Sequence, residues 1–231
     1  MIELFPCGFE EREGEGELEL AAYGDSGAAE RLARAVGPVV TERVEPGWED
    51  RWKEFHRPVR SGRLWIGPSW EQPDDDALVV VIDPGRAFGT GAHPTTRLCL
   101  EFLDRIEPGS LLDLGSGSGV VAVAAAKLGF APVVAVDLDP VAVEATRSNA
   151  GVNLVAVETL RADVLVDPLP DVDVAVANIA LATVEAIAAR VRAQVLVASG
   201  YLADERPAAK GWRTVERLVS EGWAADLLER L

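Results

Sequence analysis

Positive charge is scarce in this 231-residue sequence. Lys and Arg together number 22, against 38 Asp and Glu, which gives a formal net charge of −16. Because nucleic-acid phosphates are neutralised by Lys and Arg, this balance argues against nonspecific binding to a nucleic-acid backbone. Two interpretations stay open: the acidic surface keeps the protein soluble, or it steers a basic protein substrate toward the molecule.

Long apolar runs and targeting signals are also missing. No run of about 18 uncharged apolar residues occurs, so the sequence predicts no transmembrane helix. The first residues, MIELFPCGFEE, hold acids and no basic region, so they predict no signal peptide. The two cysteines, Cys7 and Cys99, lie far apart without metal-ligand spacing. We therefore expect reduced, buried thiols, no metal, and a cytoplasmic protein.

Two shifts in composition divide the chain. The expected parts are a small α+β domain at 1–45, a linker at 46–77 and an α/β domain at 78–231. The first part predicts a hairpin of Gly8–Glu13 with Glu17–Ala22, then a helix from about Gly27 to Val36. In the linker, one face of a short helix is aromatic, formed by Trp48, Trp52 and Phe55. Such a stripe packs in a domain interface or, as the alternative, stacks on nucleic-acid bases.

From residue 78 onward, β-branched runs alternate with helical segments. Continuous apolar runs are typical of strands that are covered on both faces of a parallel sheet. The expected strands are 78–83, 110–114, 132–137, 154–158, 172–178 and 193–199. The expected helices are 95–106, 119–129, 140–150 and 183–192. This alternation predicts a doubly wound α/β fold. Two last strands, 212–218 and 223–229, leave no room for a helix and predict an antiparallel hairpin.

One glycine-rich loop follows the strand at 110–114, in the run LLDLGSGSG. Its glycines, Gly115, Gly117 and Gly119, have G-x-G-x-G spacing. The dinucleotide fingerprint is G-x-G-x-x-G, and Val120 stands where its third glycine would be. No Gly-Lys-Ser/Thr follows, which excludes a P-loop. The backbone amides of such a turn suit a polar or anionic ligand.

Two acids accompany this loop at the ends of consecutive strands. Asp113 precedes the first glycine, and Asp137 ends the next strand in VDLDP, where a carboxylate can accept both hydroxyls of a ribose. A helix cap is the alternative role for Asp137, but Asp139 is better placed for it, directly before Pro140.

These residues resemble the nucleotide motifs of class I S-adenosylmethionine-dependent methyltransferases. The resemblance implies a seven-stranded Rossmann-like sheet that closes with an antiparallel C-terminal hairpin. It implies that Asp113, Gly115 and Gly117 line the cofactor and that Asp137 holds its ribose. It also implies that Asp163, in LRADVL, contacts the adenine, although an ordinary loop aspartate is the alternative.

A second glycine-rich run, FGTGAHPTT at 88–96, is more distinctive. Together with GWEDRWKEFHRP and VANIA, it resembles the ribosomal protein L11 methyltransferases over nearly all of residues 40–231. The resemblance implies that this segment forms a wall over the methionine end of S-adenosylmethionine. Thr96 would reach that end, with Phe88, Thr90 and Gly91 in the same wall. For His93 we favour a stabilising hydrogen bond over a role as catalytic base.

Asn178, in VANIA at the end of a strand, is the candidate catalytic residue. Amine methyltransferases place an Asn or Asp acceptor there, and its oxygen could accept the hydrogens of a neutral amine. DNA-type enzymes continue with Pro-Pro-aromatic, whereas this chain has Ile179 and Ala180, which disfavours a flipped base. The alternative role for Asn178 is to cap a strand-end turn. Asn178 also counts among the expected cofactor contacts.

The family resemblance implies a protein methyltransferase that modifies lysine ε-amines, and the N-terminal α-amine, of a basic large-subunit ribosomal protein. The related enzymes carry a ferredoxin-like substrate domain at their N-terminus. This chain begins near the end of that domain's first helix, so we expect a truncated version. Three alternatives stay open: methylation of another protein or small molecule, a nicotinamide-dependent oxidoreductase, and a noncatalytic cofactor-binding protein of ribosome assembly.

Overall fold

The computed structural model describes residues 10–13, 18–21, 33–34, 57–83 and 89–231. The chain divides into two compact units, Met1–Arg51 and Trp52–Leu231. In the smaller unit, β1 (Glu10–Glu13) and β2 (Leu18–Ala21) form an antiparallel hairpin with Glu13 opposite Leu18, as the sequence predicts. Most of the expected helix at 27–36 lies outside the described residues, as do Trp48, Trp52 and Phe55.

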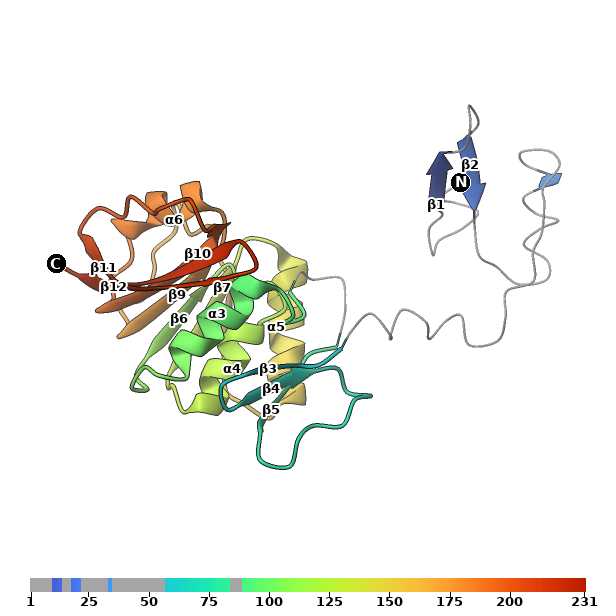
Figure 1. Ribbon diagram of the computed structural model, residues 1–231, viewed down its shortest axis with the longest axis horizontal. Helices are drawn as coiled ribbons and strands as arrows, with labels where there is room; N and C mark the ends of the chain where they lie inside the picture. The colour runs from blue at the N-terminus through green and yellow to red at the C-terminus, as the bar shows by residue number, and fades with distance from the viewer. Residues whose placement is uncertain (1–9, 14–17, 22–32, 35–56, 84–88) are drawn as a thin grey trace. The chain divides into compact units, whose positions relative to one another are not determined.

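The larger unit is built on a seven-stranded sheet (Figure 1). Its order is β11-β12-β10-β9-β6-β7-β8. The strands are β6 (Leu111–Leu114), β7 (Val133–Asp137), β8 (Glu158–Arg161), β9 (Val174–Asn178), β10 (Val195–Leu202), β11 (Trp212–Ser220) and β12 (Trp223–Arg230). Strands β6 to β10 pair in parallel, and β12 is antiparallel to both of its neighbours. The predicted C-terminal hairpin is therefore confirmed.

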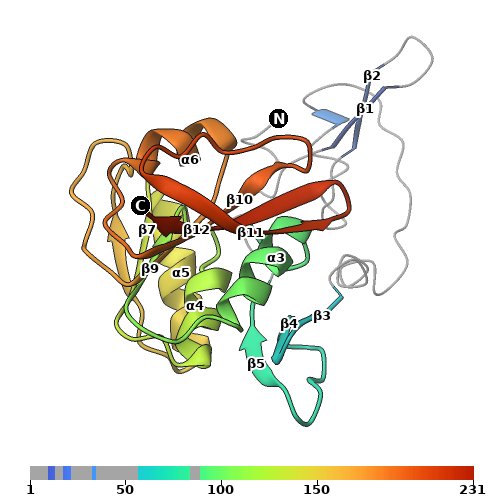
Figure 2. The same ribbon diagram turned by 60° about the vertical axis from the view of Figure 1, so that its left-hand side comes forward.

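Helices cover both faces of this sheet, as Figure 2 shows. They are α3 (Pro94–Leu103), α4 (Val120–Leu128), α5 (Pro140–Val152) and α6 (Leu181–Ala188). Residues of α3, α4 and α5 share a core with one face of the strands, while α6 packs on the other face. The doubly wound α/β prediction is confirmed. No helix among the described residues has the length and apolarity needed to span a bilayer.

A second, three-stranded sheet packs beside α3 and α4. It consists of β3 (Val59–Ser61), β4 (Leu64–Gly67) and β5 (Leu78–Val81), with β3 antiparallel and β5 parallel to β4. Leu64, Ile66 and Val80 are buried in the same core as the two helices. Part of the expected linker is thus strand. The domain boundaries at 45 and 77 stay a prediction.

The strand expected at 154–158 is wrong, because the observed strand β8 lies further along the chain and begins only at Glu158. Helix α5 runs to Val152, and Asn153 caps it through its backbone amide, which donates to Asn149 O. The Asn153 side chain also joins the helix end to β5, because it accepts from Val81 N (2.8 Å) and donates to Val81 O (2.7 Å). Leu154 then has a positive φ of 56° and is 92% exposed. The apolar run therefore serves a helix end and a turn before the strand starts.

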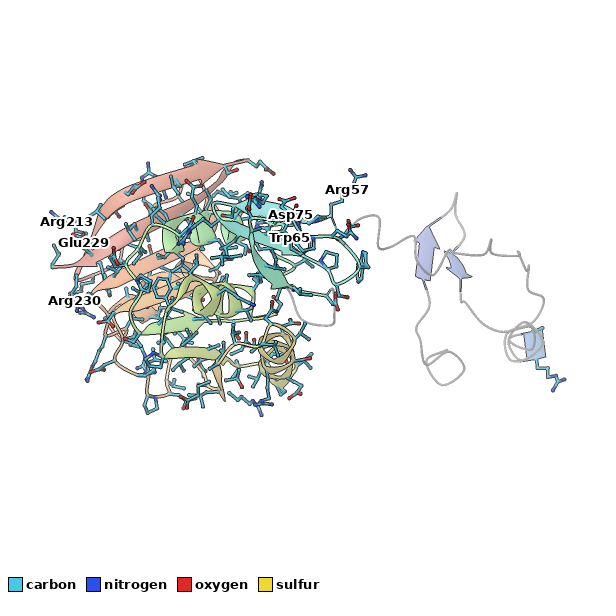
Figure 3. The ribbon with its side chains drawn as sticks, turned by 90° about the horizontal axis from the view of Figure 1, so that it is seen from below. Arg57, Trp65, Asp75, Arg213, Glu229 and Arg230 are labelled. Carbon is cyan, nitrogen blue, oxygen red and sulfur yellow. The ribbon has the colours of Figure 1, made fainter. Side chains whose placement is uncertain are left out.

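A buried ion pair fixes the C-terminal hairpin to the sheet. Asp226 is fully buried and accepts from Arg217 Nη2 (2.9 Å) and Nε (3.0 Å) and from the Tyr201 hydroxyl (2.8 Å). A carboxylate in this environment depends on its partners, because burial removes its hydration. In contrast, the Arg213–Glu229 pair lies on the surface, at the side of the unit opposite Trp65 (Figure 3).

We predict that Arg217→Ala destabilises the fold by about 3–5 kcal/mol, because it leaves the Asp226 charge buried without its cation. Arg213→Ala is the matched control and should cost less than about 1 kcal/mol, since its pair is exposed. Urea unfolding of both variants measures the difference. Similar small losses in the two variants would contradict this account of the hairpin.

Candidate functional site

The candidate site lies at the carboxyl ends of three adjacent strands. Strand β6 lies between β9 and β7 in the sheet, so the loop after Leu114 has Asn178 on one side and Asp137 on the other. In open α/β sheets, ligands bind at this edge. The structure thereby brings together the strand-end residues that the sequence singled out.

The glycine loop after β6 has a backbone that only glycine adopts without strain. Gly115, Gly117 and Gly119 have φ values of 79°, 54° and 82°. A Cβ on Gly115 would lie 2.6 Å from Ile179 Cγ2, and one on Gly119 would lie 2.8 Å from the Thr146 backbone. Two of the three glycines are therefore required by close packing as well as by conformation.

Asp137 is held in place by backbone amides. Its Oδ2 accepts from Gly117 N (2.9 Å), and its Oδ1 accepts from Asp139 N (2.9 Å). Asp139 itself caps α5 by accepting from Val141 N (2.8 Å), so the capping role falls to Asp139 as predicted. The Asp137 carboxylate is thus fixed at the strand end, and each oxygen keeps a further lone pair for a ligand hydroxyl.

On the other side of the loop, Asn178 is joined to Thr96. The Asn178 Nδ2 donates to Thr96 Oγ1 at 3.2 Å, although the two residues are 82 positions apart. Thr96 lies in the first turn of α3 and is only 4% exposed. Because the amide nitrogen is used in this bond, the Asn178 carbonyl oxygen is the branch of the side chain that is directed away from Thr96.

The second glycine-rich run lies against the first glycine loop. Ser118 Oγ donates to the carbonyl of Gly89. Gly91 has a φ of 87°, and a Cβ there would lie 2.6 Å from Ile66 Cγ2 of β4 and 3.4 Å from Val120 Cγ2 of α4. Thr90 lies between these two glycines and is half-buried. Phe88, predicted for the same wall, lies outside the described residues.

His93 begins α3 and acts as its cap. Its ring nitrogen Nδ1 accepts from Thr95 N and lies 2.8 Å from Thr95 Oγ1. The ring also packs edge-on against Trp223 at 4.8 Å between centroids. This geometry agrees with the stabilising role that we favoured for His93.

Asp113 lies beneath the loop and does not line its surface. The side chain is 2% exposed and accepts from Ala122 N (3.2 Å), a first-turn amide of α4. Gly119 gives α4 no side-chain cap, so Asp113 supplies one from the neighbouring strand. Burial raises the pKa of this carboxyl to about 7.

Asp163 closes a turn after β8. Its Oδ1 accepts from Leu165 N (2.9 Å), and its own amide donates to Asp167 Oδ2 (2.8 Å). Among the described residues, no hydrogen bond joins it to Asp137 or to the glycine loop. The structure gives Asp163 the geometry of the loop aspartate that we named as the alternative; its contact with a base stays a prediction.

Sequence reasoning missed the polar face of α5 that supports the glycine loop. Thr146 is fully buried, and its hydroxyl lies 2.9 Å from Ser116 Oγ and donates to Gly117 O (3.2 Å). Asn149 Nδ2 donates to Ser118 O (2.8 Å). With Asn153, these residues recur at i, i+3 and i+7, so their spacing on one helical face could have revealed them.

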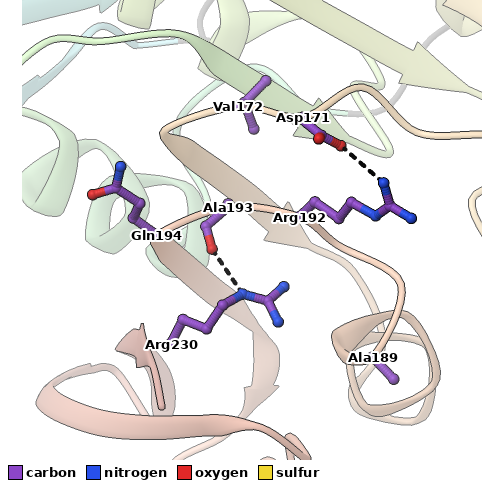
Figure 4. A pocket seen from close by; sticks show the side chains of 7 residues that line it. All are labelled: Asp171, Val172, Ala189, Arg192, Ala193, Gln194 and Arg230. Carbon is purple, nitrogen blue, oxygen red and sulfur yellow. Dashed lines mark hydrogen bonds and ion pairs between the residues drawn. The ribbon is translucent and has the colours of Figure 1, made fainter.

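A hollow of different character lies at the opposite end of the sheet (Figure 4). It is lined by Asp171, Val172, Ala189, Arg192, Ala193, Gln194 and Arg230, which cluster before β9 and β10 and at the end of β12. Arg192 pairs with Asp171 (3.7 Å), and Arg230 Nε donates to Ala193 O (3.0 Å). Its polar groups are thus engaged with each other, away from Asp137 and Asn178.

Comparison with known proteins identifies the family. The model of the family described as Ribosomal protein L11 methyltransferase (PrmA) matches residues 25–226. The chain belongs to the ribosomal protein L11 methyltransferase family. A curated member from Dechloromonas aromatica is 43% identical over 202 residues, which are 84% of this chain and 67% of that protein. Eight of the curated relatives are covered by the match over 48% to 73% of their own length.

Solved structures are also similar to this chain. A ribosomal protein L11 methylase from Lactobacillus delbrueckii subsp. bulgaricus is 28% identical with a TM-score of 0.68, covering 76% of this chain and 99% of that one. A Pyrococcus abyssi tRNA (uracil-54, C5)-methyltransferase, solved with S-adenosyl-L-homocysteine, shares the fold at 18% identity. Its TM-score is 0.55, and the match covers 76% of this chain and 44% of that chain.

We predict that Gly200→Ala displaces Asn178. Gly200 has a φ of 103° at the bulge in β10, and a Cβ there would lie 2.3 Å from the Ile179 carbonyl oxygen. The turn that follows Asn178 would have to move, which should lower the rate of any reaction at that side chain by about 10²-fold. Gly211→Ala is the control, because its φ of 87° is similar and its Cβ would meet open space. Equal activities of the two variants would contradict the prediction.

A second prediction concerns pH. Because the pKa of Asp113 is raised from 3.8 to about 7, the folded protein keeps a proton there that the unfolded chain loses. The stability contributed by this proton is therefore lost as pH rises from about 4 to about 7. As pH rises from 5 to 8, the free energy of unfolding of Asp113→Asn should rise by about 2–3 kcal/mol relative to that of the unchanged protein. Denaturant unfolding at both pH values tests this, and a pH-independent difference would refute it.

Proposed function

We propose that this chain binds S-adenosylmethionine at the carboxyl ends of β9, β6 and β7. Family membership supports this proposal, and so does the fit of the residues to such a ligand. The bare backbone of the glycine loop admits a close approach, and the Asp137 carboxylate is fixed where it can accept two ribose hydroxyls. Leu138, next to it, is 59% exposed and offers an apolar face to the base.

The amino-acid end of S-adenosylmethionine would lie toward β9, on the side of Thr96 and Asn178. This follows from the strand order, because β6 separates β7 from β9. Bound there, S-adenosylmethionine would supply a methyl group that is already activated by its sulfonium. The protein then has to orient the acceptor and exclude water from the reacting atoms.

We propose Asn178 as the residue that orients the acceptor amine. Its carbonyl oxygen would accept a hydrogen of the neutral amine and so direct the nitrogen lone pair toward the methyl group. The next two carbonyls suit this role less well. The Ile179 carbonyl packs against Gly200, and the Ala180 carbonyl accepts from Thr183 N (2.9 Å) and Val184 N (3.1 Å) in α6. The single observation that carries the proposal is the Thr96–Asn178 hydrogen bond, which fixes the amide orientation.

The acceptor that we propose is ribosomal protein L11, through its lysine ε-amines and N-terminal α-amine. The relatives' names support the protein, and the net charge of −16 suits a basic partner of the large ribosomal subunit. Each amine must be neutral to react, so its proton passes to water before transfer. We place the reaction in the cytoplasm. The small N-terminal part of the chain, residues 1–45, remains our proposal for the region that recognises the substrate.

The direct experiment incubates the protein with methyl-labelled S-adenosylmethionine and undermethylated ribosomal proteins. We predict label on L11, located by mass spectrometry on lysine side chains and the N-terminal amine. Label on a different protein would keep the cofactor and overturn the acceptor. Absence of label on every ribosomal protein would overturn the proposed activity.

Two substitutions separate binding from turnover. Asp137→Ala should weaken binding of S-adenosylhomocysteine more than tenfold, since it removes the hydrogen bonds to the ribose. Asn178→Ala should mainly lower kcat, by about 10²-fold, because the amine loses its orientation. Asp171→Ala, at the opposite end of the sheet, is the control and should change neither value. Small and equal effects of the first two changes would mean that the site lies elsewhere.

A further inference from the structure

Ser118 is the residue at which the two glycine-rich segments meet. It stands in the glycine loop after β6, is 4% exposed, and donates its hydroxyl hydrogen to the Gly89 carbonyl. Gly89 begins the described part of the FGTGAHPTT run, 29 residues earlier in the chain. This bond is therefore a tertiary link between the two segments.

A purely local role does not account for the geometry of Ser118. The hydroxyl oxygen does accept from Val120 N, but at 3.3 Å, in the first turn of α4. That bond uses a lone pair and leaves the hydroxyl hydrogen, which is directed out of the loop to Gly89. The backbone of Ser118 is held separately, since its carbonyl accepts from Asn149 Nδ2 at 2.8 Å. The serine is thus anchored from α5 while its side chain holds Gly89.

The Gly89 contact is also connected to Thr96 and Asn178, where we expect the methyl transfer to take place. Residues 89–91 lead directly into α3, whose first turn carries Thr96, and Thr96 accepts from Asn178. On the opposite side, Gly91 is confined by Ile66. The segment 89–91 is therefore held between β4 and the glycine loop, with Ser118 as the hydrogen-bonding contact to that loop.

We propose that Ser118 is a positioning residue that fixes segment 89–91 as a wall beside the amino-acid end of the cofactor. This inference rests on the proposed function, because it assumes that S-adenosylmethionine occupies the loop. The ribose and base lie toward Asp137, on the far side of β6 from Asn178, and so do not depend on this wall. Ser118 should therefore affect the two ends of the ligand unequally.

The test uses two ligands that differ only at the amino-acid end. S-adenosylhomocysteine carries the amino and carboxylate groups, whereas 5′-methylthioadenosine ends in a methyl group. For Ser118→Ala we expect the Kd of S-adenosylhomocysteine, measured by calorimetry, to rise about fivefold, as for the loss of one hydrogen bond. The Kd of methylthioadenosine should change less than twofold. The KM for S-adenosylmethionine should rise in parallel with the Kd of S-adenosylhomocysteine.

Ser110→Ala is the matched control. Its hydroxyl bonds Asp173 Oδ2 at the opposite end of β6, so both ligands should keep their affinity. Equal weakening of the two ligands by Ser118→Ala would overturn the inference, because it would mean that Ser118 only supports the loop. Unchanged affinity for both would overturn it as well. Failure of the unchanged protein to bind S-adenosylhomocysteine would instead overturn the proposed function on which the inference rests.

Discussion

The close approach of backbone at the ends of β6, β9 and β10 is the constraint on which the rest of the site depends. Ile179 lies between two glycines: its side chain meets the place of a Cβ on Gly115, and its carbonyl meets the place of a Cβ on Gly200. Its amide also donates to Ser199 O at 3.1 Å. The loops after β6 and β9 and the bulge in β10 can therefore converge only because glycine stands at Gly115 and Gly200. Asn178, one residue earlier, takes its position from this contact.

Around that contact, the site is held by elements that are distant in sequence. Helix α5 supports the glycine loop through Thr146 and Asn149, and Asp113 caps α4 from beneath. The Asp113 cap has an energetic cost, since burial of a carboxylate raises its pKa. Functional sites commonly contain residues that lower the stability of the fold but hold a functional loop in place. Here the fixed loop is the one that precedes α4.

Much of this architecture could be predicted from the sequence. The mainly apolar runs at β6, β7, β9 and β10 are largely buried, so their pattern is clear and their positions are close to those predicted. The C-terminal hairpin follows from the lack of room for a helix between β11 and β12. Asp137 and Asn178 could be placed because they directly follow such buried runs, and Gly115 because it follows β6.

Other features depended on tertiary contacts that no local pattern encodes. Strands β3 and β4 have only three and four residues and follow Pro58, so they resemble a connector. The strand expected at 154–158 failed because Asn153 ends α5 by pairing with β5, across 72 residues of sequence. Asp113 was expected beside the cofactor, yet its orientation toward Ala122 depends on how α4 packs over β6. The Ser118–Gly89 bond joins two loops whose relative position only the folded chain defines.

A crystal structure of the protein with S-adenosylhomocysteine tests the central claim most directly. The account predicts ribose hydroxyls within hydrogen-bonding distance of Asp137, the base against Leu138, and the amino-acid end beside Thr96 and segment 89–91. A ligand that binds with its ribose away from Asp137, or in the hollow between Asp171 and Arg230, would contradict it.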